Sequence, residues 1–106
     1  MTEVLVAAMK IRPGSRADFE QAVRRLRAAA VAEPGVVGYS VGQSLGEPEV
    51  YVFTERYRDA EARQAHMGAP ETKEFLAGLP GWLAEPVRVY VHHAGEPDEL
   101  TIEPAA

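Results

Sequence analysis

The sequence contains no cysteine, which excludes disulfides, thiolate catalysis, iron–sulfur clusters and cysteine-ligated zinc. It also lacks a long apolar run, because no window approaches the roughly 18 apolar residues of a membrane-spanning helix. The opening MTEVLVAAMKIRP has an acidic start and no cleavage signature. We therefore expect no membrane partner and a cytoplasmic location.

Basic residues are missing from the last part of the chain. Arg88 is the last of them, and four acids follow it, Glu96, Asp98, Glu99 and Glu103. These acids account for most of the formal net charge of −5. Because nucleic-acid binders carry an excess of positive charge, we expect no nucleic-acid partner.

Histidine is scarce, with only three residues in the chain. His92 and His93 are adjacent, so in a strand their side chains face opposite ways and cannot jointly hold a metal ion in the usual manner. The chain also has no glycine-rich phosphate loop and no nucleophile elbow. We expect no metal site and no bound cofactor.

The length of 106 residues suits one domain with one core. A hydrophobic share of 46% and a charged share of 25% are typical of a globular protein. We expect a folded domain over residues 1–93, followed by an acidic, proline-containing tail over residues 94–106.

The first half of the chain predicts a strand, a helix and a hairpin. The apolar residues 3–11 predict a strand that ends at Arg-Pro-Gly. Ser15 can cap a helix that ends at residues 33–35, because apolar residues then recur at helical spacing. Residues 36–45 and 49–57 alternate as strands do, which predicts an antiparallel hairpin.

The second half predicts a broken helix and a last strand. Asp59 can cap a helix over residues 59–67, and Gly68 then interrupts it. Pro70 suits the first turn of a further helical piece. Residues 86–93 predict the last strand.

This order, β-α-β-β-α-β, predicts an α+β ferredoxin-like subunit with a four-stranded antiparallel sheet covered by helices on one face. Along the strands, apolar residues occupy positions that face each of the two sides of the sheet. The helices cannot cover both sides, so the second face of the sheet should be apolar and uncovered. Such a face predicts a partner, and the simplest partner is a second copy packed sheet to sheet. We expect a homodimer.

Four segments, in order and at matching separations, resemble one family. They are IRPGSRADFEQAV, AEPGVVGYSV, YVFTERYRDAEARQAHMGAPETKEF and LAEPVRVYV. Together they resemble the antibiotic biosynthesis monooxygenase (ABM) domain, whose subunits form a dimeric α+β barrel. The resemblance implies a site between helices and sheet, with the broken helix at residues 66–75 in its wall.

Proteins that resemble this domain include cofactor-free oxygenases of aromatic polyketides and quinols, haem-degrading enzymes and isomerases. Several of the quinol- and polyketide-oxidising members resemble H-x(4)-H in this stretch, whereas here Glu71 stands at the second position. The haem-degrading branch needs a histidine ligand near residues 73–79, an asparagine in the first strand and a tryptophan near position 66. All three are absent, which disfavours haem degradation.

His66 is the leading catalytic candidate. A histidine side chain can take a phenolic proton at neutral pH, and the deprotonated aromatic can itself pass an electron to O₂. The alternative is that His66 only caps a helix or packs against the sheet. Glu71 could replace the second histidine of the family as an acceptor or base. It shares a helix face with Phe75, from which we expect it to point inward. The alternative is a favourable carboxylate in a first helical turn.

Glu55 is unusual in an apolar strand and needs a partner if it is buried. It shares one side of that strand with Tyr51. An ion pair at the dimer seam is one explanation, and a catalytic carboxylate is the other. Tyr39 and Trp82 could stack on a planar substrate, or they could be ordinary core residues.

The function that we predict is cofactor-independent oxidation, with O₂, of a phenolic, quinol or polyketide-like aromatic substrate. His66 and Glu71 are the predicted catalytic residues. The predicted substrate-binding residues are Tyr39, Tyr51, Glu55, Phe75 and Trp82. The alternative is a non-catalytic dimer of the same fold that binds a small ligand or responds to stress.

Overall fold

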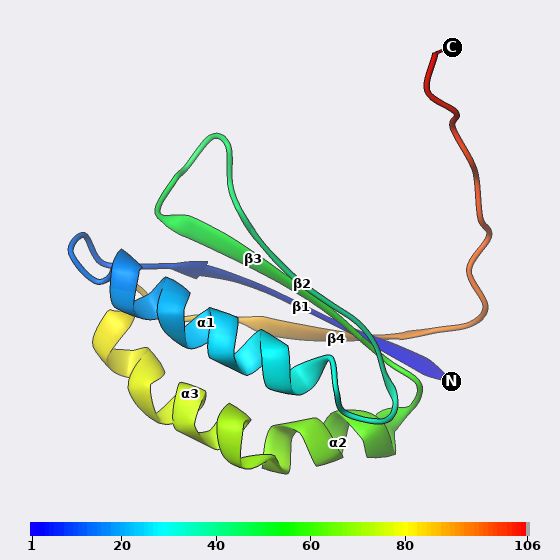
Figure 1. The fold of residues 1–106 in the computed structure, drawn as a ribbon, viewed down its shortest axis with the longest axis horizontal. Coiled ribbons are helices and arrows are strands. Elements are labelled where there is room, and N and C mark those ends of the chain that lie inside the picture. Colours follow the sequence, from blue (N-terminus) through cyan, green and yellow to red (C-terminus); the bar gives the residue numbers. More distant parts are fainter. Residues whose placement is uncertain (106) are drawn as a thin grey trace.

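The structure, a computed structural model, describes residues 1–105. Its elements are β1 (Thr2–Lys10), α1 (Arg16–Ala30), β2 (Val36–Gln43), β3 (Val50–Tyr57), α2 (Ala60–Gly68), α3 (Pro70–Trp82) and β4 (Val89–Ala94). The four strands form one sheet in the order β2-β3-β1-β4, and every neighbouring pair is antiparallel. All three helices lie on one side of this sheet (Figure 1). The predicted α+β ferredoxin-like architecture is confirmed.

Two local predictions were wrong in detail. Ser15 holds the cap position of α1, but its side chain makes no capping hydrogen bond. Its backbone, with φ −101° and ψ −3°, is not the extended form that aims a capping side chain, because the Ser15 N–H closes a turn onto the Arg12 carbonyl at 3.0 Å. The last strand begins at Val89 rather than at residue 86.

The predicted break between α2 and α3 is present and follows from the sequence. Asp59 caps α2 by accepting the Ala62 N–H at 2.8 Å. Ala69 is extended, with φ −67° and ψ 146°, because the residue before a proline avoids the helical region. Pro70 then starts α3. The break turns the chain so that the last turn of α2 and the first turn of α3 face the same part of the sheet.

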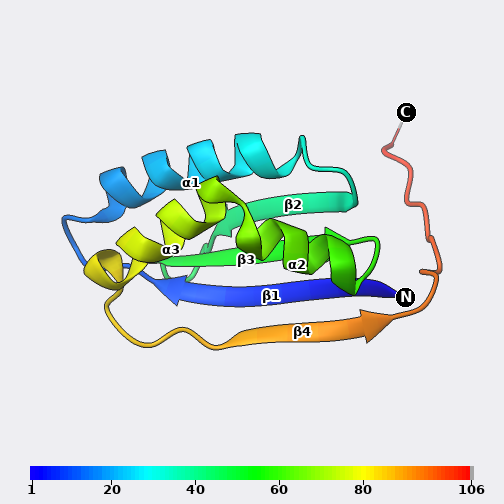
Figure 2. The ribbon, with the colours of Figure 1, turned by 90° about the horizontal axis from the view of Figure 1, so that it is seen from below.

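The core lies between the helices and the sheet. Phe19, Val23 and Leu26 of α1 are buried against the strands. Seen from the helix side, α1 runs beside β2, α2 and α3 run over the middle of the sheet, and β4 lies at the edge outside the helices (Figure 2). The helix side of β4 is therefore only partly covered.

The opposite face of the sheet carries no helix (Figure 1). Its apolar side chains come from three strands, and Val6, Val52 and Tyr90 belong to them by strand register. Val52 and Tyr90 are 38% and 56% exposed. The apolar, uncovered face predicted from the sequence is thus present, and the partner that would cover it stays a prediction.

A buried carboxylate in β1 ties α2 and β4 to the middle of the sheet. Glu3 is almost fully buried and binds Arg63 of α2. Its other oxygen lies 3.1 Å from Nδ1 of His93 in β4. These contacts fix α2 relative to the strands, and α2 carries the central residue of the site described below.

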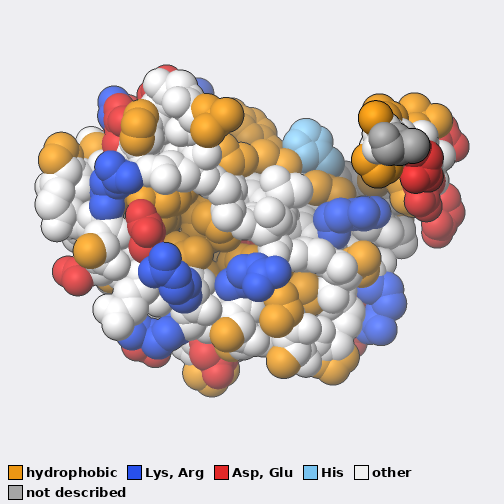
Figure 3. Space-filling model, turned by 45° about the horizontal axis from the view of Figure 1, so that its top comes forward, with side chains coloured by type: hydrophobic (Ala, Val, Ile, Leu, Met, Phe, Trp, Pro, Cys, Tyr) orange, Lys and Arg blue, Asp and Glu red, His pale blue; other side chains and the backbone are white. Residues whose placement is uncertain are grey.

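The tail adds neither a helix nor a strand over residues 95–105. It stands away from the body of the molecule, with acidic side chains along it (Figure 3). The boundary between domain and tail stays a prediction. Within residues 1–105, no helix has both the length and the apolar character needed to cross a membrane.

Candidate functional site

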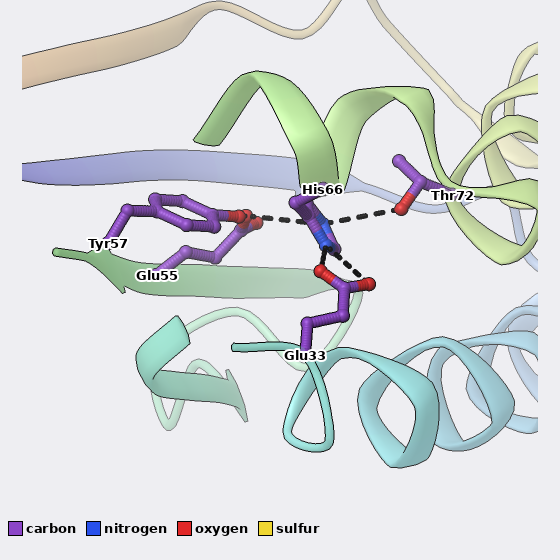
Figure 4. Close-up of polar contacts among 5 residues, drawn as sticks. All are labelled: Glu33, Glu55, Tyr57, His66 and Thr72. Atoms are coloured by element: carbon purple, nitrogen blue, oxygen red, sulfur yellow. Dashed lines mark hydrogen bonds and ion pairs between the residues drawn. The ribbon is translucent and has the colours of Figure 1, made fainter. Parts of the chain in front are cut away.

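His66 lies in the last turn of α2 and points toward the sheet. It shares the buried face of α2 with Ala62, one turn earlier, and only 2% of its side chain is exposed. A histidine in such a place has to find partners for both ring nitrogens, since unpaired buried polar atoms are costly. Both nitrogens have them (Figure 4).

Glu33 is the partner of Nδ1. Its two carboxylate oxygens lie 2.9 and 3.3 Å from this nitrogen. A carboxylate only accepts hydrogen bonds when ionised, so Nδ1 carries a proton, and in the neutral imidazole the lone pair is on Nε2. Glu33 follows the C-terminal end of α1, where the helix dipole disfavours a negative charge. The imidazole N–H compensates for that unfavourable position.

Nε2 faces Thr72 and Glu55. The Thr72 hydroxyl, in the first turn of α3, lies 3.4 Å from Nε2, and Oε1 of Glu55 lies 3.8 Å from it. Glu55 in turn accepts a hydrogen bond from the Tyr57 hydroxyl. Burial raises the pKa of the Glu55 carboxyl, and the Tyr57 hydrogen bond and the nearby His66 only partly oppose this effect.

Two tyrosine rings flank the imidazole. The ring centroids of Tyr39 and Tyr57 lie 5.5 and 5.6 Å from that of His66. Burial, followed by the influence of Glu55, raises the pKa of both phenols far above the ordinary value. Both hydroxyls therefore stay protonated at physiological pH and act as hydrogen-bond donors.

A cavity of about 70 Å³ adjoins His66. Its polar lining consists of Tyr39, Glu55, His66 and Thr72, and the remaining lining residues are apolar, Phe75 among them. This volume holds one or a few water molecules, and it is about half that of a cavity of about 150 Å³ that binds benzene. An aromatic ligand therefore requires side chains around the cavity to move.

Three predicted site residues lie elsewhere. Glu71 is exposed, so the expectation that it points inward was wrong; the next residue, Thr72, is the one that turns toward His66. Tyr51 lies four residues before Glu55 on the same side of β3, about 13 Å away along the strand. Its hydroxyl binds Glu20. Trp82, at the end of α3, packs against the Phe19 and Phe75 rings.

The structure brings together His66, Glu55, Tyr39 and Phe75 of the predicted set. It also places Glu55 on the helix side of the sheet, away from the uncovered face expected to form the dimer, so the alternative of an ion pair at the dimer seam was wrong. Sequence reasoning missed Glu33, Tyr57 and Thr72. The sequence signal for Glu33 was an acid at a helix C-terminus. The signal for Tyr57 was its position two residues after Glu55, on the same side of the strand.

The acids and histidines are not arranged as a metal site. Within residues 1–105, no three His, Asp or Glu side chains converge in the way that metal coordination requires. The chemistry open to the site is proton transfer by an oriented imidazole next to an apolar cavity, with phenolic and carboxyl groups beside it.

Comparison with known proteins agrees with this architecture. The family model described as antibiotic biosynthesis monooxygenase matches residues 3–78. YcnE of Bacillus subtilis, named as a candidate monooxygenase, is 28% identical over 86 residues, which cover 81% of this chain and 90% of YcnE. The Synechocystis protein sll1783 is 25% identical over 97 residues; they cover 92% of this chain but only 66% of that protein.

Solved structures share the fold. Rv0793 of Mycobacterium tuberculosis superposes with a TM-score of 0.87 at 24% identity, covering 93% of this chain and 100% of its own. A Caulobacter crescentus protein, titled as a candidate antibiotic biosynthesis monooxygenase, gives a TM-score of 0.84 at 28% identity, covering 90% and 91%. Since the family model spans well over half of the sequence, this chain belongs to the antibiotic biosynthesis monooxygenase family.

Proposed function

We propose that this protein is a cofactor-independent monooxygenase that oxidises a single-ring quinol or related phenol with O₂, and that His66 is its base. The observation that carries the proposal is the orientation of His66. Glu33 holds the Nδ1 proton, and Nε2 is directed toward an apolar cavity that a ring can enter once side chains move. The family membership supports a monooxygenase, and the site geometry supports the finer assignment.

In the proposed first step, a quinol hydroxyl replaces Thr72 as the neighbour of Nε2 and gives up its proton. Glu33 lies on the opposite side of the ring and stabilises the imidazolium that forms. Burial strengthens this ion pair, since few water molecules can screen it. The Tyr39 hydroxyl lines the same cavity and can turn to donate to the developing quinolate, whereas the Tyr57 hydroxyl keeps its hydrogen bond to Glu55.

In the second step, the quinolate passes one electron to O₂, and the two radicals join through a carbon–oxygen bond at a ring carbon. The imidazolium protonates the resulting peroxide. Nε2 then removes the hydrogen of that carbon while the O–O bond breaks, which leaves one oxygen on the ring as C=O. The hydroxide that leaves takes this proton from the imidazolium and becomes water. Quinol and O₂ thus give hydroxyquinone and water.

The cavity volume supports a single ring over a polycyclic substrate. At about 70 Å³ the cavity is smaller than the cavity of about 150 Å³ in which benzene is bound. Small side-chain movements can supply the difference for one ring. A fused polyketide skeleton would have to displace Phe53 and Phe75 from the core, which costs several kcal/mol of packing.

The same small volume also favours a second candidate function. A non-catalytic dimer that binds a small ligand, or that acts in a stress response, would need no larger cavity. In that case the His66–Glu33 pair has only a structural role, linking α2 to the end of α1. O₂ uptake by the wild type and His66→Ala separates these two functions.

We further propose that the protein acts as a homodimer that packs its uncovered sheet faces together. The exposed apolar side chains Val52 and Tyr90 support this assembly, since an apolar face of this kind is unfavourable in water.

The test of function is O₂ uptake with a panel of hydroquinones, for the wild type, His66→Ala and Glu71→Gln. We expect uptake above the uncatalysed rate for the wild type and for Glu71→Gln, because Glu71 is exposed and outside the site. We expect a loss of about 100-fold or more for His66→Ala, partly restored by added imidazole. No uptake with any quinol, or equal rates for wild type and His66→Ala, would refute the catalytic role of His66.

A further inference from the structure

Three exposed apolar side chains border the cavity beside His66. Met67, at the end of α2, is 39% exposed, and Leu76 of α3 is 41% exposed. Val89, at the start of β4, is 52% exposed. They come from α2, α3 and β4, and β4 lies at the edge of the sheet outside the helices (Figure 2). The cavity therefore reaches the surface through an apolar opening, which we call the mouth.

The mouth differs from the other hollows in its charge. The groove between α1 and the β2–β3 hairpin is lined in part by Glu20, Arg24 and Arg27. The groove between α1 and α3 is lined in part by Arg25, Glu71 and Glu74. In contrast, the cavity at His66 has no Lys or Arg in its lining, and its single carboxylate, Glu55, lies beside Nε2.

The polar groups of the cavity thus lie at one end and the apolar groups at the other. Tyr39, Glu55, His66 and Thr72 surround the inner end, and Met67, Leu76 and Val89 surround the mouth. An anionic substituent in the mouth would lose water and gain no cation. A hydrocarbon substituent would cover apolar side chains that are now exposed to water.

We propose that the ligand of this cavity is an uncharged phenol or quinol that carries a hydrocarbon substituent. Its hydroxyl lies at Nε2 of His66, and its substituent lies in the mouth against Leu76, Met67 and Val89. The position of the hydroxyl rests on the proposed function, whereas the role of the mouth does not require catalysis. Leu76 and Met67 are the specificity-determining residues. Their side chains move to admit the ring, and the Met67 side chain moves easily because it is unbranched.

The test measures the binding of redox-inert phenols by calorimetry, so that turnover has no influence. The probes are 4-ethylphenol, 4-propylphenol and 4-butylphenol, with 4-hydroxyphenylacetate as the anionic probe. We expect wild-type affinity to rise roughly fourfold with each added methylene group, from its transfer free energy. We expect the anionic probe to bind at least 10-fold more weakly than 4-ethylphenol.

Leu76→Lys should abolish the gain along the alkyl series and tighten binding of the anionic probe, because it places a cation in the mouth. Val89→Lys repeats this test from β4, in case the Leu76 variant does not fold. Leu45→Lys is the matched control, since Leu45 is fully exposed in the β2–β3 connection and lies outside the cavity lining. It should bind every probe as the wild type does.

The proposal is overturned if no phenol binds, if affinity is flat along the alkyl series, or if the lysine variants in the mouth behave like Leu45→Lys. These outcomes are distinct from a failure of the proposed function. Alkyl-dependent binding without O₂ uptake would refute the monooxygenase function but support the mouth as the binding site of the hydrocarbon substituent. Uptake that depends on His66 without any alkyl dependence would refute the mouth alone.

Discussion

Glu33 decides which nitrogen of His66 can act as a base. Its carboxylate, 2.9 Å from Nδ1, holds the proton there and supports a positive charge on the ring. The residue therefore contributes to the chemistry through His66 and is a positioning residue. Two substitutions test this residue-scale account.

Glu33→Gln keeps an acceptor for the Nδ1 proton but removes the charge that stabilises the imidazolium. We expect kcat for quinol oxidation to fall by about 10- to 100-fold with KM little changed, since the transition state loses more than the bound substrate does. Steady-state O₂ uptake measures this. Glu74→Gln, an exposed acid of α3, is the control. A Glu33→Gln variant with unchanged kcat would contradict the positioning role.

Glu55→Gln should make the protein more stable and less active. Because burial raises the pKa of Glu55 above its ordinary 4.5, the folded protein binds this proton more tightly than the unfolded chain does. The free energy of unfolding therefore falls as the pH rises from 4.5 through the raised pKa. The variant avoids this loss and should be more stable than the wild type near pH 8.

Urea unfolding at several pH values measures this difference, which should shrink toward zero as the pH approaches 4.5. O₂ uptake by the same variant should be reduced, because Glu55 lies 3.8 Å from Nε2. A variant that is less stable than the wild type near pH 8 would show that the ionised carboxylate stabilises the fold.

Some site residues could be predicted from the sequence and others could not. His66 could be singled out as a rare histidine at a helix break, and Glu55 as an acid in an apolar strand. Glu33 is separated from His66 by 33 residues, and only the tertiary fold brings the two together. The alternation of side chains along a strand placed Tyr51 on the correct side of β3. Alternation does not show which end of the strand lies near His66, so the long distance between Tyr51 and His66 was not predicted.

At the scale of elements, the loop between α1 and β2 sets the distance between Glu33 and α2. This loop turns at Gly35, which has φ +87°, a value that favours glycine. A Cβ at this position would lie 2.7 Å from the Ala62 Cβ of α2. The glycine therefore permits the close approach that brings Glu33 to His66.

Gly35→Ala should destabilise the protein by about 2 kcal/mol or more, from the left-handed backbone and the contact with Ala62 together. It should also lower O₂ uptake, since α2 and Glu33 are pushed apart. Gly14→Ala is the matched control, because Gly14 also has φ +87° but no atom within 4 Å of its Cβ position. It should cost about 1 kcal/mol and leave the activity unchanged.

Thermal melts and uptake assays on these two variants give the comparison. Equal losses of stability, together with full activity of Gly35→Ala, would contradict the role of this close approach. The elements themselves were largely predictable, since Asp59 and Pro70 are strong local signals for helix starts. The lack of a capping hydrogen bond from Ser15 was not predictable, because a preceding turn decides the backbone conformation of this residue.

At the scale of the whole molecule, the order of elements and the two-sided apolar pattern of the strands were sufficient to predict the architecture. The pattern could not give the cavity volume, which depends on how side chains from the helices and the sheet fill the space between them. It also could not show what covers the open face of the sheet.

The proposed dimer predicts a light-scattering mass of about twice the 11.5 kDa of the chain at micromolar concentration. Val52→Lys places a charge on the uncovered sheet face and should shift the protein toward the monomer. Val31→Lys is the control, because Val31 is 49% exposed at the end of α1, in the helical layer. A wild-type monomer, or the same mass for both variants, would contradict the sheet-to-sheet dimer.

The most direct test of the central claim is mass spectrometry of the product after reaction of a hydroquinone with ¹⁸O₂. If His66 starts a monooxygenation, the wild type should form hydroxyquinone with one ¹⁸O atom per molecule. His66→Ala should form it only at the rate of the reaction without protein. Unlabelled product from the wild type, or labelled product formed equally fast by His66→Ala, would contradict the account.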